Sequence, residues 1–321
     1  MERAPRDILF SWAQVVSGSV ALFTALGLFA SVFLLGELVV HFKVFYLLGA
    51  LASVGLFALR RKWRWLLFAG VLTAIHVPGV LVWYLPSSNT PSGEAETNLR
   101  IVTANVLTEN QEHGFFLDFI EDTQPDIIFI QELNDAWAES LQALKEAYAH
   151  YAMEPRSDNF GIAMFSRLPL DEIDIRYYGE ASVPSVHARL TLDGRSISLL
   201  SYHTLPPAGP EYMATRNRQL EAIGAYVEAQ DDLVIVAGDL NVTPWSPNYK
   251  AMIRKSGLKN ARQGHGIKPT WSGIPLPIAL LPLDHVLLSP GIAVKTFGVG
   301  PRIGSDHRPL VVDLAVPPPS R

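Results

Sequence analysis

Two short polar stretches, Gly238-Asp239-Leu240-Asn241 and Gly304-Ser305-Asp306-His307, carry most of the information in this chain. The first follows the apolar run LVIVA at 233–237, which has the composition of a buried strand, and the second precedes a strand-like segment at 309–314. A rigid sheet can direct carboxylate, carboxamide and imidazole groups at its strand ends into one cleft. These groups supply hard oxygen ligands and a proton carrier, a set that suits magnesium-assisted attack of water on a phosphate ester.

The composition divides the chain into two unlike parts. It has 321 residues, no cysteine and a net charge of −5, but the part up to Tyr84 is overwhelmingly apolar, with 7 Lys and Arg against 3 Asp and Glu. The remainder holds 19 Lys and Arg against 28 Asp and Glu, a net charge of −9, and can bury one large core. The lack of cysteine excludes disulfides and thiolate metal sites but says little about the compartment.

Apolar runs at 15–40, 42–59 and 65–84 predict three transmembrane helices. A cleaved signal peptide would have a single, shorter run. The alternative is a buried helical hairpin of a soluble protein, which three successive runs make less favourable. The linker Arg60-Arg61-Lys62-Trp63-Arg64 places four cations between the second and third runs, which marks the cytoplasmic side.

This charge pattern predicts an integral protein of the cytoplasmic (inner) membrane, with its N-terminus in the cytoplasm. Residues 1–85 are expected to form the membrane anchor, and 86–98, rich in Pro, Ser and Gly, a flexible linker. Residues 99–321 are expected to form one extracytoplasmic domain, periplasmic in a bacterium. Its strand-like and helix-like segments both alternate and cluster, which favours a mixed α/β sandwich with helices over both sheets.

Polar residues of matching chemistry stand at the ends of several predicted strands of this domain. These are Asn105, Glu132, His203, Asp239 with Asn241, and Asp306 with His307, while Asp284 begins the strand at 283–288. Taken alone, each could be a turn former or a strand cap. The joint pattern is harder to explain as independent turns.

The chain resembles the endonuclease/exonuclease/phosphatase superfamily, which has the DNase-I-like fold. The motifs that carry the resemblance appear in the family order over about 200 residues. They are Thr103-Ala104-Asn105-Val106, Gln131-Glu132-Leu133, Ser201-Tyr202-His203-Thr204, Gly238-Asp239-Leu240-Asn241, Leu283-Asp284-His285-Val286 and Ser305-Asp306-His307.

The resemblance implies a four-layer α/β/β/α sandwich with its cleft at one edge of the two packed sheets. It implies a Mg²⁺ or Mn²⁺ site formed by Asn105, Glu132 and Asp306. The catalytic residues implied are His203, Asp239, Asn241, Asp284 and His307.

In the roles that the resemblance implies, Asp284 is the carboxylate partner of His307, and Asp239 orients or deprotonates the attacking water. Either His307 or Asp239 is the general base. Asn241 would hold a phosphate oxygen, and His203 would contact the phosphate or assist the leaving oxygen.

Two further residues have both a functional and a structural interpretation. Asn159 could reach the cleft or cap a loop, and Arg216 could bind phosphate or form a salt bridge within its helix. The remaining histidines, including His285, are expected to be structural or exposed.

The sequence leaves the substrate open among phosphodiesters and phosphomonoesters, including lipids and small molecules. The acidic charge of the domain does not favour a polynucleotide, so an extracytoplasmic endonuclease is the alternative function. A non-catalytic binding module is a third. The apolar run at 274–283, with Trp271 upstream and Trp245 near the Asp239 loop, is expected either to line the rim of the cleft and meet an apolar substrate, or to lead into a core strand. No obligate protein partner is indicated.

Overall fold

The computed structural model describes residues 5–86, 98–178, 182–273 and 280–318. Its contacts divide the chain into two compact units, one of Met1–Leu85 with Trp245–Pro247 and one of Pro86–Pro244 with Asn248–Arg321. Most of the expected linker at 86–98, and positions 274–279 of the apolar run before Asp284, lie outside the described residues. The assignment of 1–85 to an anchor and of 99–321 to a catalytic domain stays a prediction.

The N-terminal unit consists of helices. They are α1 (Pro5–Gly27), α2 (Leu34–Val40), α3 (Lys43–Leu59), α4 (Trp63–Leu81) and the short 3₁₀ helix η1 (Val82–Tyr84). Segments Ile8–Gly27 and Trp63–Tyr84 are long and apolar enough to cross a membrane. Helices α2 and α3, which are bent by 65° relative to each other, would form a third span if together they cross the membrane once. Large apolar side chains such as Leu48 and Leu67 are exposed on these helices, as expected of surfaces that face lipid.

The apolar run at 15–40 is not one helix. α1 begins ten residues earlier than that run and ends at Gly27, and a turn at 28–33 precedes α2. Apolar composition continues unchanged through this turn, so hydropathy carried no signal of the bend.

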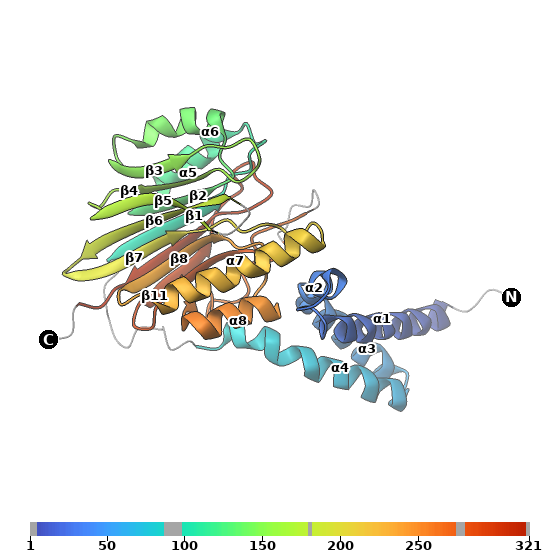
Figure 1. Ribbon diagram of the computed structural model, residues 1–321. Helices are drawn as coiled ribbons and strands as arrows, with labels where there is room; N and C mark the ends of the chain where they lie inside the picture. The colour runs from blue at the N-terminus through green and yellow to red at the C-terminus, as the bar shows by residue number, and fades with distance from the viewer. Residues whose placement is uncertain (1–4, 87–97, 179–181, 274–279, 319–321) are drawn as a thin grey trace. The chain divides into compact units, whose positions relative to one another are not determined.

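The second unit contains two six-stranded sheets (Figure 1). The first has the order β11-β12-β1-β2-β4-β3, with β1 (Leu99–Asn105), β2 (Ile127–Gln131), β3 (His150–Glu154), β4 (Ile162–Ser166), β11 (Ala293–Val299) and β12 (Leu310–Ala315). The second has the order β5-β6-β7-β8-β10-β9, with β5 (Glu172–Tyr178), β6 (Val183–Leu192), β7 (Arg195–Ser201), β8 (Leu233–Asp239), β9 (Lys259–Asn260) and β10 (Asp284–Leu288).

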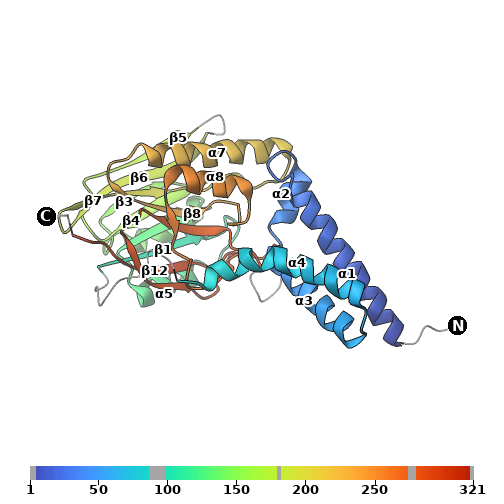
Figure 2. The ribbon, with the colours of Figure 1, turned by 90° about the horizontal axis from the view of Figure 1, so that it is seen from below.

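The two sheets pack face to face and helices cover their outer faces (Figures 1 and 2). Buried side chains of both sheets, among them Ile101 and Phe129 of the first and Ile235 and Val286 of the second, form one core cluster. The outer face of the first sheet is covered by α5 (His113–Thr123), α6 (Asp135–Ser140) and the 3₁₀ helix η2 (Leu141–Leu144). The outer face of the second is covered by α7 (Pro210–Glu228) and α8 (Pro247–Ser256). The predicted four-layer α/β/β/α sandwich is confirmed.

Candidate active site

The predicted site residues stand at neighbouring strand ends of both sheets. Asn105 ends β1 in parallel register with Gln131, the last residue of β2, so Glu132 follows directly beside it. In the other sheet, Asp239 ends β8 and is paired with Asp284, the first residue of the antiparallel β10. Because the sheets pack face to face, these four strand ends meet at one edge of the sandwich.

Only a glycine can precede Asp239. Gly238 has a φ of +140°, and a Cβ atom there would lie 2.0 Å from the carbonyl oxygen of Tyr202. Any side chain would push apart the segments that leave β7 and β8. The glycine of the Gly-Asp pair therefore fixes where the Asp239 carboxylate enters the site.

Asp239 lies at the centre of the site and is 1% exposed. Its Oδ2 accepts a hydrogen bond of 3.2 Å from Nδ2 of Asn105. The same oxygen lies 3.6 Å from Nε2 of His203 and 3.5 Å from Nε2 of His307. Its Oδ1 accepts a 2.9 Å bond from the backbone N–H of Asn241. One buried carboxylate thus contacts groups from both sheets.

His307 and Asp284 form a buried pair beside Asp239. Nδ1 of His307 lies 2.8 Å from Oδ2 of Asp284. A carboxylate on one ring nitrogen orients the imidazole and directs the other nitrogen outward. Here that other nitrogen, Nε2, faces Asp239.

The charges of these three groups act on one another. Burial by itself would lower the pKa of His307, but the charges of Asp284 and Asp239 raise it to about 10. Burial raises the pKa of Asp239, and the positive charge of His307 offsets part of this effect. Burial alone would raise the pKa of Asp284, but the charge and hydrogen bond of His307 hold the pKa of that carboxyl below its usual value. In this arrangement His307 carries the proton between two carboxylates.

Glu132 is held in a strained conformation next to Asn105. Its φ is +63°, in the left-handed region that residues with side chains avoid, and its N–H donates to the carbonyl oxygen of Gly161 at 2.8 Å. Its Oε1 accepts a 2.7 Å hydrogen bond from Nδ2 of Asn105, while Oδ1 of Asn105 accepts from the N–H of Leu107. Asn105 therefore presents an N–H group to the carboxylates, and its amide would have to turn to offer an oxygen to an ion.

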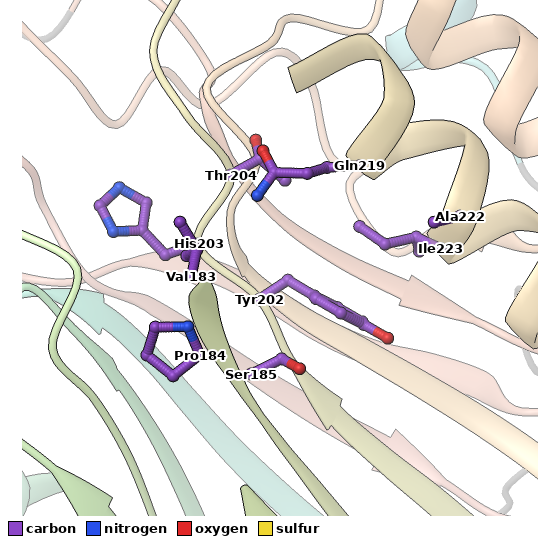
Figure 3. A pocket seen from close by; sticks show the side chains of 9 residues that line it. All are labelled: Val183, Pro184, Ser185, Tyr202, His203, Thr204, Gln219, Ala222 and Ile223. Atoms are coloured by element: carbon purple, nitrogen blue, oxygen red, sulfur yellow. The ribbon is translucent and has the colours of Figure 1, made fainter. Parts of the chain in front are cut away.

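His203 reaches the site because side chains alternate along an extended chain. Figure 3 shows the rings of Tyr202 and His203 on opposite sides of the backbone that leaves β7. Tyr202 packs in the core beneath α7, whereas Nε2 of His203 lies 3.8 Å from Oε1 of Glu132. The cavity in Figure 3, lined in part by Gln219 and Ile223 of α7, has a volume of about 10 Å³. It holds one water at most, so it is not a substrate site.

Asn241 is supported from behind by Arg216. Nδ2 of Asn241 donates to the carbonyl oxygen of Thr204 at 2.8 Å and lies 3.2 Å from Nε2 of His203. Arg216 is fully buried in α7 and donates to the carbonyl oxygen of Asn241 at 3.0 Å and to Oδ1 of Asn217. Its guanidinium holds the Asn241 loop rather than facing the cleft.

Among the residues that the structure describes, two groups of side chains have ligand atoms within 4.8 Å of one another, close enough to share an ion. They are Glu132, His203 and Asp239, and Asp239, Asp284 and His307. In the second group, Asp284 and His307 already bind each other. The carboxylates of Glu132 and Asp239 are hard oxygen donors, so the first group fits Mg²⁺ or Mn²⁺ better.

Asp306, expected among the metal ligands, lies in neither group. Its Oδ2 accepts a 2.8 Å hydrogen bond from the indole N–H of Trp271. It still lines the same cleft as Glu132, Asp239 and His307, a cavity of about 400 Å³.

Several residues that line this cleft were not identified as candidates from the sequence. They are Leu107, Asp158, Phe160, Pro206 and Tyr212. They lie in loops and in the first turn of α7, and their only sequence signal is proximity to a motif. Asn159 and Trp271 also line the cleft, whereas Trp245 is buried and does not.

A model of the Endonuclease/Exonuclease/phosphatase family matches residues 102–307. Comparison with curated protein sequences finds no match. Among solved structures, an endonuclease/exonuclease/phosphatase from Bacteroides vulgatus is similar with a TM-score of 0.56 and 19% identity, over 69% of this chain and 100% of the other.

Two further solved structures are similar over 67% of this chain and 98% of their own. D. rerio TDP2 complexed with single strand DNA product has a TM-score of 0.55 and 19% identity. Sphingomyelinase C from Streptomyces griseocarneus has a TM-score of 0.51 and 17% identity. At these identities, the structures share the fold of the second unit.

Proposed function

Because the chain belongs to the Endonuclease/Exonuclease/phosphatase family, whose members hydrolyse phosphate esters, we propose that it is a divalent-metal-dependent phosphoesterase anchored at the outer face of the cytoplasmic membrane. The observation that carries the proposal is the position of Asp239. This buried carboxylate lies within 3.6 Å of Asn105, His203 and His307 at the floor of an open cleft.

In this proposal Glu132 and Asp239, with Asn105 and Asp306, would hold Mg²⁺ or Mn²⁺, which would supply positive charge to the phosphate oxygens. Asp239, whose Oδ2 lies 3.5 Å from Nε2 of the protonated His307, would accept the proton of the attacking water. Asp284 keeps His307 oriented, as its 2.8 Å contact with Nδ1 indicates.

The remaining two side chains act on the phosphate. Nδ2 of Asn241 and Nε2 of His203 lie 3.2 Å apart and adjoin the central carboxylate. They would stabilise the negative charge that develops on the phosphate or on the leaving oxygen.

The experiment is hydrolysis of bis-p-nitrophenyl phosphate by the purified full-length protein in detergent, with Mg²⁺ or Mn²⁺ and with EDTA. We expect turnover that EDTA abolishes and that Asp239→Asn reduces by about a hundredfold or more. Asp118→Asn, an exposed carboxylate on α5, is the matched control and should retain full turnover. Failure of the wild-type protein to hydrolyse any phosphate ester with either ion would overturn the proposal.

An endonuclease is the second candidate, since a similar solved structure is that of TDP2 with a single strand DNA product. The net charge of −9 after Tyr84 and the carboxylates in the cleft weigh against a polynucleotide substrate. Plasmid DNA in the same assay tests this candidate, and nicking at a rate comparable to diester hydrolysis would favour it.

The orientation in the membrane is part of the proposal and rests on the cations at 60–64 and the apolar helices of the N-terminal unit. Because the chain has no cysteine, single cysteines placed at Arg61 and at Asp118 can be labelled selectively. A membrane-impermeant maleimide added to intact cells should label Asp118→Cys but not Arg61→Cys. The reverse pattern would place the domain in the cytoplasm.

A further inference from the structure

The buried lining residues of the cleft (its floor) differ in chemistry from the more exposed ones (its walls). The floor consists of Asp239, His203 and His307. The walls carry polar residues such as Asp158 and Asn159 and also apolar and aromatic side chains from separate segments. The apolar and aromatic ones are Leu107 after β1, Phe160 before β4, Pro206 after β7, Tyr212 in α7 and Trp271. Apolar side chains beside a phosphate-binding floor favour a substrate with an apolar group next to its phosphate.

The cleft is also rich in negative charge. Carboxylates of Glu132, Asp158, Asp239 and Asp306 line it, and over the described ranges of the chain no Lys or Arg does. Arg156, in the same loop as Asp158, forms ion pairs with Asp158 and with Glu154. The pairs Arg156–Asp158 and His307–Asp284 are each neutral. Glu132, Asp239 and Asp306 then carry three negative charges, against the two positive charges of one divalent ion. A phosphate that carries a single negative charge is therefore favoured over a dianionic monoester or a polyanion.

Trp271 is a preorganised part of the wall. Its indole N–H donates to Oδ2 of Asp306 at 2.8 Å, which ties the ring to the residue before His307. The ring also rests on Gly273, where a Cβ atom would lie 2.2 Å from Cη2 of the indole. The orientation of this large apolar surface is therefore set before substrate binds.

Tyr212 and Phe160 provide further aromatic surface. Tyr212 is 47% exposed, because it lies at the cleft and not on the face of α7 that packs against the sheet. Phe160 lies against His203, with ring centroids 5.2 Å apart. Apolar surface therefore continues from the rim to a residue at the reacting centre.

We propose that the cleft selects monoanionic phosphodiesters in which an apolar alkyl or aryl group adjoins the phosphate. This inference rests on the proposed function. Water adds its oxygen to phosphorus, one P–O bond breaks, and the leaving oxygen takes a proton, so that a diester and water yield a monoester and an alcohol or phenol. Lipid phosphodiesters and small alkyl or aryl phosphodiesters share this chemistry.

The test uses the full-length protein in detergent with Mn²⁺ or Mg²⁺ and substrates that release the same p-nitrophenol. Methyl, butyl and hexyl p-nitrophenyl phosphate differ only in apolar surface. p-Nitrophenyl phosphate adds a second charge, and thymidine 5′-p-nitrophenyl phosphate replaces the alkyl group with a polar nucleoside. We expect kcat/KM to rise along the alkyl series by up to about fourfold per buried methylene. The monoester and the nucleotide diester should both be poorer substrates than the butyl diester.

Variants separate the wall from the catalytic floor. Gly273→Ala should displace the Trp271 ring, and Tyr212→Ser should remove exposed aromatic surface. Both should lower the ratio of kcat/KM for the hexyl and methyl diesters by about tenfold, mostly through KM. Trp271→Phe keeps an apolar ring but loses the bond to Asp306, so it should retain most of this ratio. Phe115→Ser, an exposed aromatic of α5 outside the cleft, is the control and should leave the ratio unchanged.

The outcomes distinguish the inference from the function on which it rests. No p-nitrophenol from any substrate would overturn the proposed function. Hydrolysis without an increase from methyl to hexyl, or with preference for the monoester or the nucleotide, would overturn the inference alone. A parallel assay with dihexanoyl phosphatidylcholine below its micellar concentration, and with long-chain phosphatidylcholine vesicles, tests whether the substrate is a lipid. Hydrolysis of either phosphatidylcholine would identify lipid phosphodiesters as the substrate class. A preference for longer alkyl groups with no lipid hydrolysis would identify small diesters instead.

Discussion

Nδ1 of His307 lies 2.8 Å from Oδ2 of Asp284, although the two residues are 23 positions apart in the chain. Asp284 begins β10 and His307 precedes β12, so the pair joins the two sheets of the sandwich at the cleft. Both side chains are buried, and the charge of each stabilises that of the other.

The substitution Asp284→Asn should therefore disable the enzyme without unfolding it. The carboxamide would keep the shape of the carboxylate but not its charge, so the pKa of His307 should fall and its ring should lose its fixed orientation. We expect kcat to fall by about 10² to 10⁴. The measurement is diester hydrolysis under saturating substrate, with Asp118→Asn as control. Turnover equal to that of the wild type would show that the pair has no part in the reaction.

Substitutions of Glu132 and Asp306 should differ in how strongly they weaken metal binding. Glu132→Gln removes a charged oxygen from the group that it forms with His203 and Asp239, so Mn²⁺ binding measured by calorimetry should weaken by about tenfold or more. Asp306→Asn should have a smaller effect, because its carboxylate oxygen is engaged by Trp271. Glu109→Gln, at an exposed position, is the control. A larger loss of Mn²⁺ affinity for Asp306→Asn than for Glu132→Gln would show that Asp306 is a principal ligand.

Gln131 joins the two sheets directly beneath the site. Its Oε1 accepts from Oγ1 of Thr103 and its Nε2 donates to Oγ of Ser201, each at 3.3 Å, and all three side chains are buried. Gln131→Leu leaves both hydroxyls without this partner and should cost about 1–3 kcal/mol. The midpoint of thermal unfolding in detergent should fall by several degrees, whereas the exposed Gln111→Leu should leave it in place. Equal midpoints for the two variants would show that the bridge adds no stability.

His187 should make the stability of the catalytic unit depend on pH. Burial, with a smaller contribution from the charge of Arg176, lowers the pKa of His187 to about 4. In the unfolded chain the pKa is about 6.5, so between these values the unfolded state binds more protons and stability rises with pH. This contribution, up to about 3 kcal/mol, is fully present above pH 6.5 and is lost as the pH falls toward 4.

The variant His187→Phe tests this dependence, because it keeps an aromatic ring against Tyr202 and Tyr226 but cannot be protonated. Thermal midpoints measured from pH 4.5 to 7.5 should fall less steeply toward acid for the variant than for the wild type. Parallel curves would mean that His187 does not contribute to the acid sensitivity.

Local sequence was sufficient to predict that most of the candidate site residues lie at strand ends. Asn105, Asp239 and Asp284 stand at the ends of strands, where apolar runs give way to polar residues, and that transition is visible without any knowledge of the fold. The apolar helices of the N-terminal unit were predictable for the same reason, since hydropathy is a local property. The break between α1 and α2 was not, because apolar composition does not change through the turn at 28–33.

Only the tertiary structure decided which group each side chain contacts. Asp306 binds the indole of Trp271, Asn105 turns its N–H toward the carboxylates, and Arg216 supports the Asn241 loop. Each contact joins segments far apart in the chain, so it depends on the pairing of strands and the packing of the two sheets. The apolar walls of the cleft arise in the same way, because loops such as those carrying Leu107 and Phe160 become neighbours only when the sandwich closes. The sequence thus determined the inventory of chemical groups, and the long-range packing of the two sheets determined their geometry.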